Sequence, residues 1–377
     1  MVHNQIQQQH LPQLDGLRGV AIAIVLLGHM LVFGVGFGLT QLGSLPPVGV
    51  TLFFVLSGFL ITRILLDARE KPNYYLSFYA RRALRIWPLY FLILAALFWV
   101  TNHRVAGLTF DENQVRWPFF LLYVQNIVYK NAILLGPPAL GITWSLAVEE
   151  QFYTTWPLIV RNLTNVVLKR VLFVFIAMAP IARFVCPQFG FDPYINPLCR
   201  FDAMAMGGLV AIWMTERQPG RETISRVAWS VVAISFGMGV VCYVAGVGHL
   251  VSKTVESGMW TAVLLGAMCS VFVARILSHA ALRFLGKISY CAYLTHFIVA
   301  SFTISLWPGT GMGIRLFRVI VVLSMTCLIG ALSWRYLEEP ILRFKQYFPS
   351  GKVLPVNQLE SSPAITLANS GRTERTA

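Results

Sequence analysis

Arg18 could bind an anion and His29 could act as a general base, and their spacing suits a single helix. They are eleven residues apart, close to three helical turns, so they share a face with about 16 Å of rise between them. A neutral imidazole suits proton transfer near neutral pH, because its unperturbed pKa is about 6.5. The structural alternative is a histidine hydrogen-bonded to a neighbouring helix and an arginine whose head extends to water.

Glu149 and Glu150 are adjacent carboxylates inside the mostly apolar segment TWSLAVEEQFYTTWP. Adjacent residues point about 100° apart on a helix, so one can face a reaction site and the other a structural base. We expect these glutamates to orient His29, to bind a proton or to pair with an arginine. A buried ion pair with a neighbouring helix is the alternative.

Three arginines, Arg81, Arg82 and Arg85, precede Trp87-Pro88. Arginine forks suit phosphate groups, so the cluster predicts a mouth that holds a phosphate-rich ligand. The alternative is a cluster that fixes topology or contacts anionic lipid headgroups.

Two further groups are candidates for substrate binding. Ser289, Tyr293 and His296 stand at i, i+4 and i+7, a single helical face, which predicts a polar stripe toward a cavity unless the aromatic rings only pack between helices. Arg200 and Asp202 lie at the end of another apolar segment, where a local ion pair is the alternative.

Composition excludes most soluble classes for these 377 residues. The hydrophobic fraction is 56% and the charged fraction 12%, whereas a soluble domain carries about 25% charged residues. So few charges cannot cover a water-facing surface, which argues against a cytosolic enzyme, a nucleic-acid-binding protein and a disordered chain.

The sequence predicts an all-α, polytopic membrane helix bundle. A span needs about 20 mostly apolar residues. We expect a short re-entrant or interfacial helix at 117–133, because its apolar core is interrupted by Gln125 and Asn126. The ten predicted spans are 18–38, 48–66, 84–101, 142–160, 171–186, 200–215, 227–247, 257–275, 288–307 and 316–337.

Charge orients these spans. With ten spans and 117–133 left out, 22 of the 30 lysines and arginines fall on the side of the N-terminus. Cytoplasmic loops collect such residues, so we expect both termini in the cytoplasm. Counting 117–133 as a span would place Arg161, Lys169 and Arg170 outside. The net charge of +14 then follows from the loops and needs no nucleic acid.

Three regions follow: a polar segment at 1–13, a membrane domain at 14–347 and a disordered cytoplasmic tail at 348–377, which is rich in Ser, Thr, Pro, Asn and Gln. We expect no cleaved signal peptide. No metal-binding spacing is present, and we expect no metal. Cys186 and Cys199 lie at the outer ends of neighbouring spans, and whether they form a disulfide stays open.

Seven segments stand in order between residues 14 and 345: LDGLRG at 14–19 followed by His29, GVTLFFVLSGFLIT at 49–62, FYARRALRIWPLY at 78–90, TWSLAVEEQFY at 143–153, RFDAMAMG at 200–207, LGKISYCAYLTH at 285–296 and YLEEP at 336–340. Each is weak alone, but seven in one order are specific. Together they resemble the acyltransferase 3 family of integral-membrane acyltransferases.

The resemblance implies transfer of an acyl group, most often acetyl, from cytoplasmic acyl-CoA to a hydroxyl of a glycan or other acceptor at the outer face of the bacterial inner membrane. It implies that Arg18 and His29 are required, and by analogy that Arg81, Arg82 and Arg85 hold the CoA phosphates. The motif positions assigned to substrate binding are Arg200, Asp202, Ser289, Tyr290 and His296. Some relatives carry an extra extracytoplasmic esterase-like domain; we expect a stand-alone form, or one that hands acyl groups to a separate partner protein.

The resulting hypothesis places the thioester of acyl-CoA near His29, with Glu149 or Glu150 holding the imidazole tautomer or taking its proton. The acceptor, such as lipopolysaccharide O-antigen or exopolysaccharide, would arrive from the outer side near Arg200 and Asp202. Direct transfer and an acyl-enzyme both stay open. The alternatives are a proton-coupled transporter, which also needs intramembrane His and Glu, and acylation of a small molecule such as a macrolide.

Overall fold

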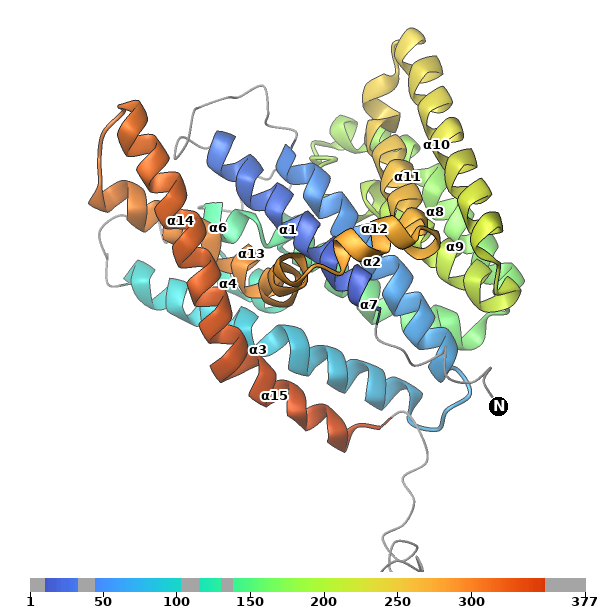
Figure 1. Cartoon of the computed structure of the whole chain (residues 1–377), viewed down its shortest axis with the longest axis horizontal. Coiled ribbons are helices and arrows are strands. Elements are labelled where there is room, and N and C mark those ends of the chain that lie inside the picture. Colours follow the sequence, from blue (N-terminus) through green and yellow to red (C-terminus); the bar gives the residue numbers. More distant parts are fainter. Residues whose placement is uncertain (1–10, 33–44, 103–114, 130–137, 350–377) are drawn as a thin grey trace, which may run out of the picture.

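The computed structural model describes residues 11–32, 45–102, 115–129 and 138–349, and the regular elements in these ranges are helical (Figure 1). Ten long helices coincide with the ten predicted segments, which confirms the helix bundle. The predictions for 1–13 and 348–377 fall almost wholly outside the described residues. The long helices are α1 (Pro12–Val32), α2 (Leu45–Ala68), α3 (Tyr74–Asn102), α7 (Trp144–Asn162), α8 (Asn165–Val185), α9 (Phe201–Arg217), α10 (Arg221–Val244), α11 (Gly248–Cys269), α13 (Ala280–Leu306) and α14 (Met312–Ser333).

The described residues contain seven helices that are long and apolar enough to cross a membrane, or eight if α11 and the helix after it form one bent span. α7, which holds Arg161 as well as Glu149 and Glu150, and α9, which has only 17 residues, are not among them. The chain is therefore an integral membrane protein. α7 and α9 both pack against the more apolar helix α2.

The predicted span at 257–275 is wrong in its course. α11 ends at Cys269, and the chain bends by 101° before α12 (Val271–Leu277), which packs against α1. The Ser270 side chain accepts a hydrogen bond from the backbone N–H of Val273, a helix N-cap that starts a new helix inside an apolar run. Hydropathy alone cannot detect such a break.

The segment around 117–133 forms two short helices, α4 (Trp117–Leu121) and α5 (Gln125–Val128), neither long enough to cross a bilayer. Residues 130–133 lie outside the described part. Gln125 and Asn126 are buried, and their amide nitrogens donate to the carbonyl oxygens of Thr143 (3.1 Å) and Ile195 (3.3 Å). These two polar residues therefore fasten α5 to the protein interior.

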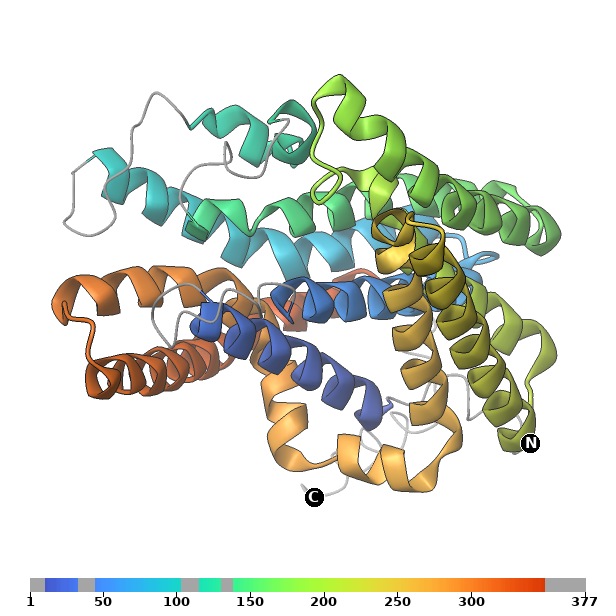
Figure 2. The same cartoon turned by 90° about the horizontal axis from the view of Figure 1, so that it is seen from above.

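α1 and α2 lie side by side in the middle of the bundle, α13 packs on α1, and α9 packs on α2. Figures 1 and 2 show the α13–α14 hairpin at one end of the molecule and α10 with α11 at the other. The C-terminal part of the described chain returns to the bundle at α15 (Glu339–Arg343), which packs against α3. The short helix α6 (Pro138–Gly141) contacts α13.

Two glycines allow the central helices to approach closely. A Cβ on Gly286 of α13 would lie 1.9 Å from the carbonyl oxygen of Asp15 on α1, and a Cβ on Gly207 of α9 would lie 2.1 Å from that of Val55 on α2. Side chains cannot occupy such contacts, so glycine is required wherever these helices touch through their backbones. The α1–α13 contact holds the candidate site.

Candidate active site

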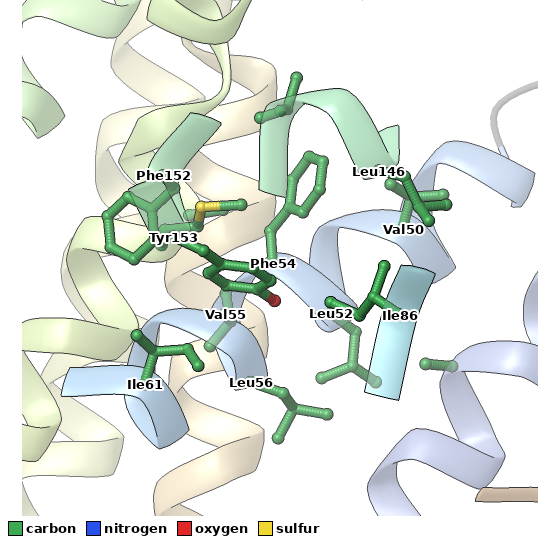
Figure 3. Packing of buried hydrophobic residues seen from close by; sticks show 14 of the residues in the cluster. Val50, Leu52, Phe54, Val55, Leu56, Ile61, Ile86, Leu146, Phe152 and Tyr153 are labelled. Atoms are coloured by element: carbon green, nitrogen blue, oxygen red, sulfur yellow. The ribbon is translucent and has the colours of Figure 1, made fainter. Parts of the chain in front are cut away.

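A cavity of about 100 Å³ lies where five helices meet, and its wall carries most of the residues that the sequence singled out. Phe54, Ile86, Leu146 and the ring of Tyr153, which come from α2, α3 and α7, form its apolar part (Figure 3). Its polar lining consists of Arg18 from α1, Ser57 from α2, Arg82 and Arg85 from α3, Ser145, Glu149 and Glu150 from α7, and Ser289, Tyr290 and Tyr293 from α13.

A second cavity, of about 560 Å³, adjoins the first at Arg18 and Arg85, which line both. Arg283, Lys287 and Asp15 also line it, so four basic side chains face one acidic one. Asp15 is close to Arg18, with 3.7 Å between Oδ1 of Asp15 and Nη1 of Arg18. The second cavity is thus a strongly basic chamber, and the arginine pair connects it to the first cavity.

Glu149 ends a short chain of hydrogen bonds in the first cavity. The hydroxyl of Tyr153 donates to Ser57 Oγ (2.9 Å), and Ser57 Oγ donates to Glu149 Oε1 (2.5 Å). The Arg82 guanidinium lies 5.2 Å from the centre of the Tyr153 ring. Arg81, which the sequence grouped with Arg82, is exposed and lines neither of the two cavities.

Glu150 has a buried carboxylate oxygen, Oε1, with no hydrogen-bond partner among the described residues. A buried carboxylate oxygen without a partner is costly, so this wall of the cavity suits a water molecule or a ligand that carries a donor. The hypothesis that Glu149 or Glu150 holds the imidazole of His29 finds no described contact, because both carboxylates face the first cavity. Another side chain holds that ring.

His29 pairs with His296 across the α1–α13 contact. Nδ1 of His29 and Nε2 of His296 are 3.0 Å apart, and the two rings stack with their centres 5.0 Å apart. Phe297 packs on the His29 ring at 4.7 Å. Both histidines are buried. The face predicted from spacing is therefore continuous, since Ser289 and Tyr293 line the cavity and His296 lies one turn further along α13.

His29 itself lines neither described cavity. The first cavity reaches Ser145 and Tyr293, whose hydroxyl oxygens are 2.7 Å apart, and the Tyr293 hydroxyl also contacts the Ile142 carbonyl oxygen (2.9 Å). The Tyr293 and His296 rings are 6.0 Å apart. The hydroxyl pair of Ser145 and Tyr293 thus lies at the end of the first cavity that is nearest to the histidine pair.

Arg200 and Asp202 do not form the local ion pair considered above. The Arg200 guanidinium lies over three aromatic rings, 5.5 Å from the centre of Phe54, 5.4 Å from Trp144 and 5.7 Å from Tyr194. Phe54 also lines the first cavity, so Arg200 is one ring away from it. Cation–π contacts of this kind hold a desolvated guanidinium in place.

Asp202 is instead bound by a residue that the sequence analysis did not select. Its Oδ2 accepts hydrogen bonds from Arg183 (2.5 Å) and from Thr254 (2.6 Å), which joins α8, α9 and α11. No spacing links Arg183 to Asp202, because the pairing depends on which helices are neighbours. The Sγ atoms of Cys186 and Cys199 lie 3.7 Å apart nearby, and both are free thiols in this structure.

Removing the charge of Asp202 should unfold this corner of the bundle. Asp202→Asn leaves the Arg183 cation buried without its counter-ion, so we expect the free energy of unfolding to fall by about 3–5 kcal/mol. The half-exposed pair of Lys169 and Glu216 (3.0 Å) gives the control, because Glu216→Gln should cost less than about 1 kcal/mol. Thermal unfolding of the detergent-solubilised protein, followed by tryptophan fluorescence, measures both; equal shifts would contradict the buried-pair explanation.

Other residues of the site were visible in the sequence only as parts of motifs or as loop charges. Ser57 and Tyr153 lie within two of the seven segments, but an isolated hydroxyl in a span carries no signal of its own. Arg283 and Lys287 counted only toward orientation. The chamber that they line becomes visible once α13 is seen to begin at Ala280.

Comparison with known proteins identifies relatives of this chain. The chain is 27% identical over 382 residues to the peptidoglycan O-acetyltransferase OatA of Listeria monocytogenes, covering 92% of this chain and 58% of the relative. It is 28% identical over 376 residues to YrhL of Bacillus subtilis, provisionally named a peptidoglycan O-acetyltransferase, covering 90% of this chain and 56% of the relative. The chain thus spans little more than half of each relative's length.

No solved structure matches the chain. The model of the acyltransferase 3 family, described as an acyltransferase domain, matches residues 11–334. This range holds nearly the whole membrane bundle and six of the seven segments from which the resemblance was drawn, all but YLEEP at 336–340. The protein belongs to the acyltransferase 3 family.

Proposed function

We propose that this protein is a membrane O-acyltransferase that moves an acyl group, acetyl by preference, from cytoplasmic acyl-CoA to a hydroxyl of a cell-envelope glycan. The observation that carries the proposal is the order of sites along α1. Arg18 lies in the wall shared by the basic chamber and the first cavity, and His29, eleven residues on, lies in a buried histidine pair. A phosphate-bearing thioester bound at the first would have its acyl end directed to the second.

The basic chamber supports CoA as the donor. CoA carries several phosphate charges, and Arg18, Arg85, Arg283 and Lys287 converge on one volume with only Asp15 to offset them. Guanidinium groups bind phosphate through charge-assisted, two-pronged hydrogen bonds. The smaller apolar cavity beyond the arginine pair suits the uncharged arm of the donor. Its hydroxyl pair, Ser145 and Tyr293, must part for the thioester to reach His29.

The chemistry assigned to this site is acyl transfer with His29 as general base. The acceptor oxygen attacks the thioester carbonyl carbon, a C–O bond forms and the C–S bond breaks. The acceptor proton passes to the imidazole and then to the departing CoA thiolate, which leaves as the thiol. Proton transfer by a positioned histidine contributes about 10²–10⁴-fold to rate, and hydroxyl donors such as that of Tyr293 can stabilise the oxyanion.

The acceptor and the orientation are part of the proposal. Two relatives bear names that refer to peptidoglycan, so we place the acceptor among envelope glycans, with peptidoglycan ahead of lipopolysaccharide O-antigen and exopolysaccharide. The loop charges favour the bacterial inner membrane with both termini in the cytoplasm. The acceptor would then approach from the outer side, where Arg200 is held behind Phe54.

Labelled acetyl-CoA tests the proposal directly. The purified full chain in nanodiscs is incubated with acetyl-CoA alone and with peptidoglycan fragments, O-antigen or exopolysaccharide. Slow hydrolysis without acceptor and label transfer to one of the glycans is the expected result. If acetyl-CoA neither binds nor turns over, while proteoliposomes show substrate-driven proton flux, the protein is a transporter and the proposal is wrong.

Arg85→Ala should weaken CoA binding specifically. Loss of one charge-assisted hydrogen bond costs about 1.5–3 kcal/mol, which raises KM for acetyl-CoA about 10- to 100-fold. Acetyl-pantetheine lacks the phosphates, so kcat/KM for this truncated donor should be unchanged. Arg81→Ala is the charge-matched control four residues earlier on α3, and we expect its KM to change less than twofold. Equal effects of both variants, or an equal loss with acetyl-pantetheine, would contradict phosphate binding at Arg85.

A further inference from the structure

We propose that His296 is a positioning residue that holds the proton of His29 on Nδ1 and thereby keeps the lone pair of His29 on Nε2, the nitrogen that takes the acceptor proton. The inference rests on the proposed function and replaces the substrate-binding role that the sequence suggested for His296. It follows from three contacts of the two rings.

The first step fixes the tautomer of His296. Its Nδ1 lies 2.7 Å from the carbonyl oxygen of Tyr293 and 3.2 Å from that of Ala292, both on its own helix. A carbonyl oxygen can only accept a hydrogen bond, so Nδ1 of His296 must carry a proton. This assignment needs no assumption about the neighbouring histidine.

The tautomer of His296 in turn determines the tautomer of His29. A neutral imidazole carries one proton, so Nε2 of His296 has a lone pair and accepts. The atom 3.0 Å from it is Nδ1 of His29, which must therefore donate. The lone pair of His29 then lies on Nε2. Both rings are buried, 8% and 0% exposed, and burial favours the neutral imidazoles that this chain of donors requires.

The third step is mechanical. The two imidazole rings stack on each other, and the Phe297 ring lies 4.7 Å from each of them, so the packing restrains both rings together. The backbone carbonyl of Tyr293 thus orients His296, and His296 orients His29, as a carboxylate orients the histidine of a hydrolase triad. Where an orienting group presents the wrong tautomer in such triads, kcat falls by about 10⁴-fold.

A matched pair of variants isolates this role. Glutamine places an amide oxygen where Nε2 of His296 lies, whereas asparagine is one bond shorter and reaches only the position of Nδ1. His296→Gln should therefore keep kcat within about tenfold of the parent. His296→Asn should lower kcat by 100-fold or more at unchanged KM for acetyl-CoA. Thermal unfolding of both variants verifies that they are folded.

The tautomer can also be read without activity. Nitrogen NMR of the full chain labelled with ¹⁵N-histidine, in lipid bilayers, distinguishes protonated from unprotonated ring nitrogens, and loss of a signal in His29→Gln assigns His29 among the seven histidines. We expect the His29 proton on Nδ1 in the parent and in His296→Gln, and a proton on Nε2 in a substantial fraction of His296→Asn.

Three results would overturn the inference: a His29 proton on Nε2 in the parent, an unchanged tautomer in His296→Asn, or a His296→Gln variant as inactive as His296→Asn while the tautomer is kept. The last result would make His296 a residue that acts on the substrate. Failure of the proposed function has a different signature, because the parent protein itself would then not turn over acetyl-CoA, whatever tautomer His29 adopts.

Discussion

His29→Ala should abolish acyl transfer while leaving acyl-CoA binding intact. The substitution removes the proposed base, so we expect kcat for hydrolysis and for transfer to fall by about 10³-fold or more, in the upper range of general-base contributions. Arg18 and Arg85 are untouched, and the basic chamber should bind acetyl-CoA as before. Turnover of labelled acetyl-CoA gives the first quantity, and thermal stabilisation of the protein by a titration of CoA gives the second.

His249→Ala is the control, because His249 is exposed at the start of α11 and lines neither described cavity. It should match the parent in both measurements. Activity retained by His29→Ala would show that acyl transfer happens elsewhere. If CoA no longer stabilised His29→Ala against thermal unfolding, the histidine would have a structural role in the chamber in addition to any role in the reaction.

Gly207→Ala should separate α9 from α2. The single added carbon would lie 2.1 Å from the Val55 carbonyl oxygen and 2.7 Å from the Phe59 backbone nitrogen, and neither atom can move without its helix. Overpacking of this kind costs about 1–3 kcal/mol where side chains can adjust, so a clash with backbone should reach or exceed about 3 kcal/mol. The yield of folded protein from membranes and its thermal midpoint in detergent measure the effect.

Gly237→Ala provides the matched change on α10, where an added Cβ meets nothing within 4 Å. It should be neutral or slightly stabilising, because alanine favours the helix more than glycine does. A Gly207→Ala variant as stable as Gly237→Ala would mean that α2 and α9 do not touch through their backbones.

Hydropathy predicted the ten long helices but placed the first residue of several of them too late in the sequence. α1 begins at Pro12 where 18 was predicted, and α13 begins at Ala280 where 288 was predicted. The added turns carry Asp15 and Arg283, which an apolarity criterion excludes from a span. Charged residues that line the basic chamber are therefore part of the reason why these helix ends were missed.

Those groups of site residues that lie on a single helix could be predicted from the sequence. Spacing alone put Arg18 and His29 on a shared face and joined Ser289, Tyr293 and His296 into a stripe. Contacts between helices were not predictable, because they depend on packing. For this reason the glutamates were expected at His29, where the structure places His296, and Asp202 was considered with Arg200, where the structure places Arg183.

The unbroken course of α1 makes it a ruler. A continuous helix keeps the interval between the shared cavity wall and the buried imidazole constant, at about 16 Å. If the proposed function is correct, the donor is selected by the length of its pantetheine arm as well as by its phosphates, and a shortened pantetheine analogue would reach only one end of this interval. Inserting one alanine after Val25 would lengthen the interval by only about 1.5 Å but would swing the imidazole about 100° away from α13. Such a variant would still bind the phosphates of its donor but would no longer place the imidazole of His29 at the thioester.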